Sequence, residues 1–337
     1  MDDNPKYYDV GIIGGGLAGL SASIMLARAG YRVVLFEKET YPFHKVCGEY
    51  ISLESWDILL SLGLDLDSME LPIINTLLLT SPGGSELKQK LPLGGFGISR
   101  FTIDHALAEI AKKSGVDVCD GTRVNGVEFS NNQFIVDTNK RGIACKVCCG
   151  AFGKRSNLDV KWKRKFTLHK PNALNNYIGI KYHAALDHPR NIIALHNFKD
   201  GYCGISPLED NKSCICYLTT AQNLKISDNN IKRMEKEILY KNPFIAKVFS
   251  NADLLYEEPL TISQISFQKK EQIENHILLI GDAAGMLTPL CGNGMSMALH
   301  ASRIACKWIE KFLSNDMDRE KMENMYRQEW NKEFSKR

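Results

Sequence analysis

The hydrophobic positions at the start of the chain follow two periods in succession. Residues 9–13 are a short apolar run typical of a buried strand, and residues 17–27 repeat apolar side chains at the spacing of one helix face. Gly30 then stands where a helix usually ends, and residues 31–36 predict a second strand. The pattern therefore predicts one β-α-β unit over residues 9–37.

Further along the chain the pattern changes to short strands separated by turns. Strands are predicted at 177–183, 191–197, 202–206 and 213–219, and one helix is predicted at 230–240. We expect these strands to form an antiparallel layer. Close to the end, residues 277–280 predict a buried strand that leads into a glycine-rich turn and a helix. A second amphipathic helix follows residue 318.

The turn of the first unit has the chemistry of a dinucleotide site. In the sequence Gly14-x-Gly16-x-x-Gly19, the first glycine permits a tight turn, the second lets a pyrophosphate approach, and the third allows close helix packing. The free N–H groups at the helix start favour phosphate. Glu37, at the end of the second strand, is placed to accept from a ribose hydroxyl. The unit therefore predicts FAD or NAD.

Composition limits the partners and the location. The 337 residues are 44% hydrophobic and 24% charged, with a net charge of +3, which is typical of a soluble globular protein and does not favour nucleic acid. We expect no transmembrane segment and a cytoplasmic location, because no signal-peptide core or apolar run of bilayer length occurs. The basic run at 161–165 leaves peripheral membrane contact open. The ten cysteines are expected to be reduced and to bind no metal.

The segment from residue 281 to 295 carries a family resemblance. It reads Gly-Asp-Ala-Ala-Gly, then a proline and Gly-x-Gly before a helix. This resembles the second FAD motif of the p-hydroxybenzoate hydroxylase-like flavoproteins, which include the geranylgeranyl reductase branch. The resemblance implies that Asp282 bonds the ribityl chain and that the backbone from Gly292 to Met295 faces the flavin.

Four further segments resemble the same family. Arg100 leads a helix as the family's flavin-side arginine does, although a surface or salt-bridging role is the alternative from residue type alone. Gly150 lies in a segment where Cys149 replaces the family's aspartate, and Val124 lies where a strand passes the adenine. Residues 41–49 resemble the K-x-C-G segment beside the isoalloxazine.

Cys47 is the candidate catalytic residue of that segment. A thiol beside the flavin could donate a proton or contact substrate, and the alternative is a small buried packing residue. Lys45 and Glu49 are either an ion pair at the site or exposed charges. The full set of expected cofactor-binding residues is Gly14, Gly16, Leu17, Ala18, Gly19, Glu37, Lys38, Lys45, Val46, Cys47, Gly48, Arg100, Val124, Gly150, Gly281, Asp282, Pro289, Gly292, Gly294 and Met295.

The resemblance also implies a fold with two parts. We expect an α/β, Rossmann-type FAD-binding domain of the glutathione reductase-2 and p-hydroxybenzoate hydroxylase-like class, with an interleaved β-sheet substrate domain. The FAD-binding domain is predicted at 1–75, 98–158 and 270–313, the substrate domain at 76–97 and 159–269, and a C-terminal helix at 314–337.

The reaction is expected to be that of an FAD-dependent oxidoreductase. The first hypothesis is an NAD(P)H-dependent monooxygenase that hydroxylates an apolar or aromatic secondary-metabolite intermediate, with NAD(P)H as transient electron donor. The second is a reductase or dehydrogenase of a carbon–carbon double bond, and the third is an FAD-binding protein without turnover. Tyr202 and Pro207 are candidate substrate residues by resemblance, whereas Gly204 and Ser206 replace the two aromatics of the family's pocket segment.

Overall fold

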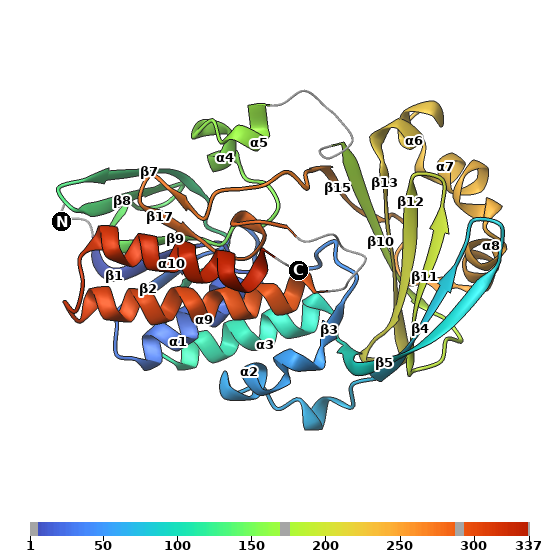
Figure 1. The fold of residues 1–337 in the computed structure, drawn as a ribbon, viewed down its shortest axis with the longest axis horizontal. Helices are drawn as coiled ribbons and strands as arrows, with labels where there is room; N and C mark the ends of the chain where they lie inside the picture. Colours follow the sequence, from blue (N-terminus) through green and yellow to red (C-terminus); the bar gives the residue numbers. More distant parts are fainter. Residues whose placement is uncertain (1–5, 169–175, 287–292, 336–337) are drawn as a thin grey trace.

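The computed structural model describes residues 6–168, 176–286 and 293–335. In these residues two β-sheets lie in two halves of the molecule, with helices packed on the outer sides of both (Figure 1). One sheet is largely parallel and is joined by helical crossovers, and the other is largely antiparallel. The predicted α/β fold with a second sheet is therefore confirmed.

The first sheet contains the β-α-β unit that the sequence predicts. Its central strand β1 pairs in parallel with both β2 and β9, which bury their side chains on both faces and therefore read as continuous apolar runs. The strands follow the order β16–β17–β9–β1–β2–β6, with β8 paired to β9 and β7 to β8. Their bounds are β1 Lys6–Ile13, β2 Val33–Phe36, β6 Asp117–Cys119, β7 Val124–Ser130, β8 Gln133–Thr138, β9 Ile143–Gly150, β16 Ile273–Glu274 and β17 Ile277–Leu279.

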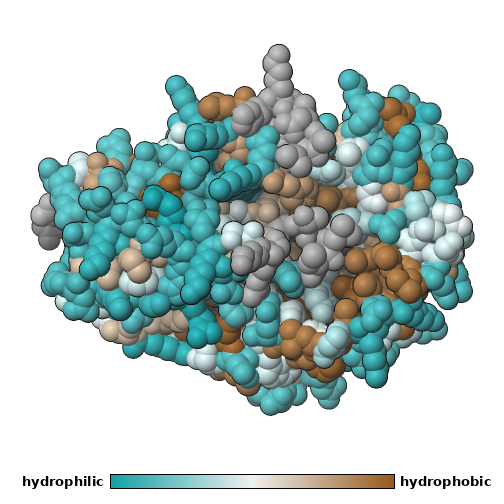
Figure 2. Space-filling model, in the orientation of Figure 1, coloured by the Kyte–Doolittle hydropathy of each residue, from teal (hydrophilic) through white to brown (hydrophobic). Residues whose placement is uncertain are grey.

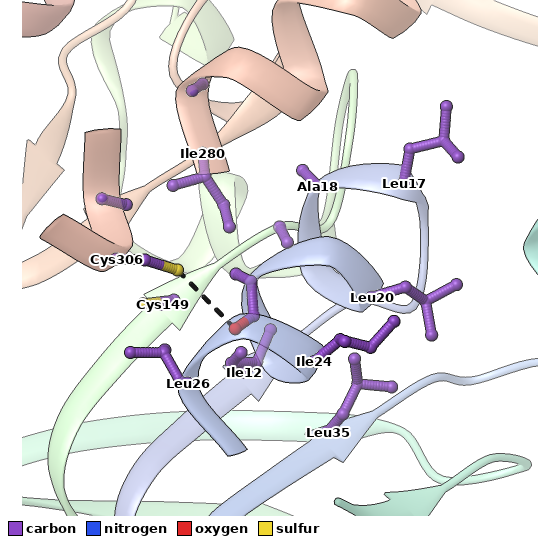
Figure 3. Close-up of a cluster of buried hydrophobic side chains, with 14 of the residues drawn as sticks. Ile12, Leu17, Ala18, Leu20, Ile24, Leu26, Leu35, Cys149, Ile280 and Cys306 are labelled. Atoms are coloured by element: carbon purple, nitrogen blue, oxygen red, sulfur yellow. Dashed lines mark hydrogen bonds between the residues drawn. The ribbon is translucent and has the colours of Figure 1, made fainter. Parts of the chain in front are cut away.

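Helices α1 and α9 pack closely on this sheet because small residues line their contact. The Ser302 hydroxyl donates to the Ala18 carbonyl at 2.8 Å. The Cys306 thiol donates to the Ala22 carbonyl at 3.6 Å, which is the dashed line from Cys306 in Figure 3. An added Cβ at Gly281 would lie 3.0 Å from the Ala18 Cβ. The starts of both helices therefore meet the turn after β17. The helices of this half are α1 Leu17–Arg28, α2 Trp56–Ser61, α3 Arg100–Lys113, α4 Asn157–Lys161, α5 Lys165–Leu168, α9 Gly294–Leu313 and α10 Arg319–Phe334.

The second sheet has one face packed against helices. Its strands follow the order β14–β10–β13–β12–β11–β4–β5–β3, and β15 pairs with β10. The covered face contributes a separate hydrophobic core that includes Ile180, Tyr217 and Ile205, over which α7 and α8 supply Met234 and Ile245. The elements are β3 Tyr50–Ser52, β4 Ile73–Thr80, β5 Glu86–Gly97, β10 Tyr177–Ala185, β11 Ile192–Phe198, β12 Gly201–Pro207, β13 Lys212–Thr220, β14 Asp253–Leu254, β15 Leu260–Ile265, α6 Ala221–Ile226, α7 Ile231–Glu237 and α8 Pro243–Asn251.

Two details differ from the sequence-based expectations. The helix predicted at 230–240 is α7 followed by a separate 3-10 turn, Leu239–Lys241, because the backbone at Ile238 departs from helical geometry (φ −117°). The strands β3 and β4 pair in the second sheet, so residues 50–52 and 73–75 associate with that sheet although the predicted domain boundary placed them in the FAD-binding part. Short 3-10 turns also occur at Leu53–Ser55, Asp67–Met69, Glu209–Asn211 and Gly281–Ala283.

The described part of the chain includes no helix of the length and apolar character required to cross a bilayer.

Candidate functional site

Two glycines of the turn between β1 and α1 pack directly against neighbouring backbone. Gly14 has φ +111°, and an added Cβ there would lie 2.4 Å from the Ala151 carbonyl oxygen. An added Cβ at Gly19 would lie 1.9 Å from the Gly14 carbonyl oxygen. These two positions admit only glycine, because any side chain would collide with backbone.

Gly16 differs, because the position where its side chain would lie is next to two cations and not next to backbone. An added Cβ there would lie 3.3 Å from Nη2 of Arg100 and 3.7 Å from Nζ of Lys45. Gly16 also caps α1, and no side chain bonds the free N–H groups of the first helical turn. An uncapped helix start beside two cations is a site for an anion, and its glycines let a pyrophosphate approach. These residues fit the dinucleotide predicted from the sequence.

The two cations are held in place by a buried carboxylate. Arg100 donates two hydrogen bonds to Asp104, at 2.8 and 2.7 Å, and Lys45 Nζ lies 3.0 Å from the same carboxylate. Burial raises the pKa of Asp104, but Arg100 and Lys45 outweigh that effect and lower it. Arg100 is thus a salt-bridging residue that also lies beside the glycine turn, and its expected position near the flavin stays a prediction.

Glu37 lies at the end of β2, beside the same turn. Its buried carboxylate accepts from the N–H of Gly15 at 2.9 Å and from the N–H of Glu39 at 3.1 Å. This is the position expected of an acid that bonds a ribose. Lys38 points elsewhere: its side chain is exposed, and Nζ lies 3.5 Å from the Glu39 carboxylate.

The turn after β17 meets the starts of α1 and α9. Gly281 has φ +61°, and Asp282 is half-buried at this turn. Helix α9 begins at Gly294 without a side-chain cap, and the buried hydroxyl of Ser296 in its first turn has no hydrogen-bond partner among residues 6–168, 176–286 and 293–335. A helix start with an unsatisfied buried hydroxyl also fits a polar ligand edge. The expected residues Pro289 and Gly292 lie outside the described residues.

Residues 45–48 connect the two halves of the molecule. The half-buried Cys47 side chain contacts the Arg100 guanidinium, while its carbonyl accepts from the Cys214 thiol on β13 at 3.3 Å. The Val46 carbonyl accepts from Lys154 Nζ at 3.3 Å. Cys47 therefore lies between the glycine turn and the second sheet, which is the location expected for a residue beside the flavin.

Glu49 forms the most buried ionic group at this junction. Its Oε1 accepts from Lys181 Nζ at 2.5 Å and from the Arg100 N–H at 2.7 Å, and its Oε2 lies 2.6 Å from His183 Nε2. Burial raises the pKa of Glu49, but His183 and Lys181 outweigh it and hold that pKa below its ordinary value. Both interpretations of Glu49 from the sequence are wrong, because its cationic partner is Lys181 and its side chain is buried.

Glu49, His183 and Cys214 also bring three potential metal ligands within 4.8 Å of one another. The ligand types suit zinc. However, Lys181 already bonds the same carboxylate, and burial raises the pKa of Cys214 well above its usual value, so a neutral thiol faces the cluster. We therefore assign the cluster as a buried ion-pair network. Glu49 lies more than 130 positions from Lys181 and His183, so no local spacing could have revealed the cluster.

The face of the second sheet that is turned toward this junction is apolar and partly open. Strand register aligns one row of side chains that leads from a fully buried lysine to a leucine that is 57% exposed, across about 24 Å at the usual strand spacing. Figure 2 shows hydrophobic surface in the hollow between the two halves and over β4 and β5. The row is Lys181, Cys216, Gly204, Leu195, Leu79 and Leu87.

The two candidate substrate residues on β12 lie on opposite faces. Tyr202 shares the open face with Gly204, because side chains two positions apart point the same way. Pro207 falls on the packed face and is buried, so the structure does not bring it to Tyr202. An added Cβ at Gly204 would meet only ordinary contacts at 3.5 Å, so this position leaves a gap in the open face.

The remaining expected residues occupy the first half. Leu17 and Ala18 are buried in the first turn of α1, and Met295 is buried in that of α9. Gly150 ends β9 and Val124 begins β7, whereas Gly48 is exposed in the junction segment.

The fold and this site together define an FAD-dependent oxidoreductase. Residues 7–329 match the family model described as FAD binding domain, and the chain belongs to that family.

Two curated proteins and one solved structure illustrate what the chain is similar to. Conditioned medium factor receptor 1 of Dictyostelium discoideum is 26% identical over 98% of this chain and 69% of its own length. Digeranylgeranylglycerophospholipid reductase of Methanosarcina acetivorans is 26% identical over 96% of this chain and 80% of its own. Among solved structures, a myxobacterial FAD-dependent chondrochloren halogenase superposes with a TM-score of 0.79 at 18% identity, covering 98% of this chain and 81% of that one. That likeness shows the fold.

Proposed function

We propose that the chain is a flavin-dependent reductase that adds hydrogen across a carbon–carbon double bond of an elongated, apolar substrate. The observation that carries this proposal is the open face of the second sheet, which leads about 24 Å from Leu87 to the buried cluster around Lys181. Apolar ligands bind where such surface meets a few polar groups. The reductase of Methanosarcina acetivorans, whose name specifies a digeranylgeranyl lipid, supports the same substrate class.

The cofactor site in this proposal is built from the two glycine-containing turns. Gly16, Arg100 and Lys45 receive the pyrophosphate, and Glu37 exchanges its bond with Gly15 for a ribose hydroxyl. Gly281, Asp282 and the start of α9 receive the ribityl chain and the flavin edge. The junction segment with Cys47 then lies between cofactor and substrate. Once NAD(P)H has reduced it, the bound FAD would supply hydride to the substrate carbon.

Cys47 provides the matching proton. Reduction of the double bond needs one hydride at one carbon and one proton at its neighbour, and the Cys47 thiol holds a proton at this place. The thiolate left behind is stabilised by the Arg100 guanidinium and regains its proton from solvent. NAD(P)H is the hydride donor that restores the reduced cofactor.

A monooxygenase is the second candidate. It would use the same fold, NAD(P)H and an apolar pocket. The likeness to a halogenase structure shows that flavoproteins other than reductases share this fold. Hydroxylation of an aromatic secondary metabolite would need no proton from Cys47, so a C47A variant distinguishes the two reactions. A protein that binds FAD without turnover is the third candidate.

Product analysis distinguishes the three. The FAD-loaded protein is incubated with NADPH or NADH and polyprenyl probes, once without oxygen and once under ¹⁸O₂. The reductase gives a product with two added hydrogens in both gases, and C47A lowers kcat more than it raises KM. Incorporation of ¹⁸O identifies the monooxygenase, and failure of every donor to reduce the bound cofactor identifies the third candidate.

A further inference from the structure

Three buried side chains hold three consecutive carbonyls of the turn after β17. Lys270 Nζ donates to the Asp282 carbonyl at 2.8 Å, Arg164 Nη1 donates to that of Ala283 at 3.0 Å, and Gln272 Nε2 donates to that of Ala284 at 3.2 Å. All three side chains are at most 3% exposed at the residue level. A turn that bonds one buried donor at each of three successive carbonyls has little freedom to change its backbone.

Lys270 does more than hold one carbonyl. It also donates to the Lys154 carbonyl at 2.8 Å, so one ammonium connects the turn after β17 to the loop after β9. Lys154 itself bonds the Val46 carbonyl beside Cys47. Through these bonds Lys270 links the turn that carries Asp282 to the junction segment.

Arg164 anchors the same turn to the rest of the first half. It pairs with Asp159 at 2.8 Å and donates to the Glu271 carbonyl at 2.9 Å. The carbonyls of residues 282–284 are bonded by these donors, and the Asp282 side chain remains half-buried.

We propose that Lys270, supported by Arg164 and Gln272, is a positioning residue that orients the turn 281–284 for FAD and couples FAD affinity to its own charge. This inference rests on the proposed placement of FAD at Asp282. It concerns a residue that the proposed chemistry does not use. A charged donor at two carbonyls is stronger than a neutral one, so loss of the charge loosens both loops.

The surroundings of Lys270 make that charge sensitive to pH. Burial lowers the pKa of Lys270 to about 8, because Asp282 and Asp159 only partly offset it while Arg164 and Lys154 lower it further. The Phe166 ring lies 4.5 Å from the Lys270 ammonium, and it carries no charge that would raise the pKa of this lysine. Lys270 therefore loses its proton in mildly alkaline solution, well before an ordinary lysine does.

The test measures the affinity of the full chain for FAD at pH about 7 and at pH about 9. Quenching of flavin fluorescence reports binding, and circular dichroism confirms that each variant is folded. The variants are Lys270→Met, Lys270→Arg, and Lys269→Met, an exposed neighbour that serves as the matched control. We expect Lys270→Met to weaken FAD binding by about tenfold or more at neutral pH. The wild type and the control should weaken at the higher pH, and Lys270→Arg, which keeps its charge, should not.

Each outcome is decisive. If the wild type binds FAD and Lys270→Met binds it equally well with the same pH profile, the positioning role is wrong and the proposed function stands. If the folded wild type binds no FAD at either pH, both are wrong. If Lys270→Met does not fold, the pH profiles of the wild type and Lys270→Arg decide: parallel profiles reject the inference, and divergent ones support it.

Discussion

The two faces of the second sheet show how one scaffold serves packing and chemistry. A buried glutamate lies against each face. On the helix-covered face, Glu235 accepts from two phenols, those of Tyr182 at 2.9 Å and Tyr217 at 2.6 Å. On the face turned to the first half, Glu49 is bonded by Lys181 and His183.

The two carboxyl groups respond to burial in opposite ways. Burial raises the pKa of Glu235, and two neutral donors do not reverse that shift. Burial raises the pKa of Glu49 as well, yet His183 and Lys181 reverse it. The packed face thus raises the pKa of its carboxyl group, whereas the cations of the junction lower the pKa of theirs. Perturbed pKa values of the second kind, with specific charged partners, are common at functional sites.

The largest expected effect comes from removing the junction anion. Glu49→Gln leaves the fully buried Lys181 without its carboxylate, so the free energy of unfolding should fall by about 3 to 5 kcal/mol. Glu235→Gln, the matched change on the other face, replaces a group with no cationic partner and should cost about 1 kcal/mol or less. Urea unfolding of both variants measures the difference. Equal losses of stability would contradict the proposed difference between the two faces.

A second mutation separates charge from packing at the junction. The double variant Glu49→Gln with Lys181→Met removes both charges, and it should recover most of the stability lost in Glu49→Gln. An additive loss in the double-mutant cycle would show that the ion pair is not what the substitution disrupts.

The pH dependence of stability should have opposite signs on the two faces. The folded-state pKa of Glu49 lies below its unfolded value near 4.5, so its contribution is present above that pH and is lost as pH falls through the folded pKa. The folded-state pKa of Glu235 lies above its unfolded value, so its contribution is full in acid and is lost as pH rises through the folded pKa.

Unfolding curves from strongly acidic to neutral pH test these signs, because the Glu49 contribution is lost only below the unfolded pKa near 4.5. The stability deficit of Glu49→Gln should shrink as pH falls, and the stability of Glu235→Gln relative to wild type should improve as pH rises. Deficits that move in the same direction would contradict the opposite pKa shifts of the two glutamates.

The smallest effect concerns neighbouring positions on β12. Gly204→Leu points to the open face, where an added Cβ meets contacts of 3.5 Å, and it should change stability by less than about 1 kcal/mol while raising KM for polyprenyl probes. Cys203→Leu points into the packed face, where Cys203 is fully buried, and should cost about 1 to 3 kcal/mol. Thermal unfolding and steady-state kinetics give the two readouts. An unchanged KM in the Gly204→Leu variant would show that the open face is not part of the substrate site.

The sequence predicts the local parts of this site and misses the distant ones. The glycine turn with Glu37, the turn with Asp282, and the Arg100 helix are short segments whose spacing carries their geometry. The bond between Glu49 and Lys181 joins residues 132 positions apart, and the bond between Lys270 and Lys154 joins residues 116 apart. Such contacts depend on how two sheets dock, and no period or motif in one sequence encodes that docking.

Pro207 illustrates a different limit. The resemblance to a family segment predicted that Pro207 and Tyr202 both contact the substrate. Alternation along β12 instead directs the two side chains to opposite faces of the sheet. A linear motif lists positions and does not by itself assign faces. Conversely, Gly204 gains its meaning only from the strand register, which places it in the middle of the open row.

Titration of FAD into the wild type and Gly16→Val tests the central claim, that the glycine turn and its two cations hold the cofactor between the halves. The added side chain would point at Arg100 and Lys45 and not at backbone, so the variant should fold. We predict one FAD per wild-type chain and a loss of affinity of about a hundredfold or more in Gly16→Val. A folded wild type that stays colourless with FAD, or a variant that binds it equally well, would contradict the account.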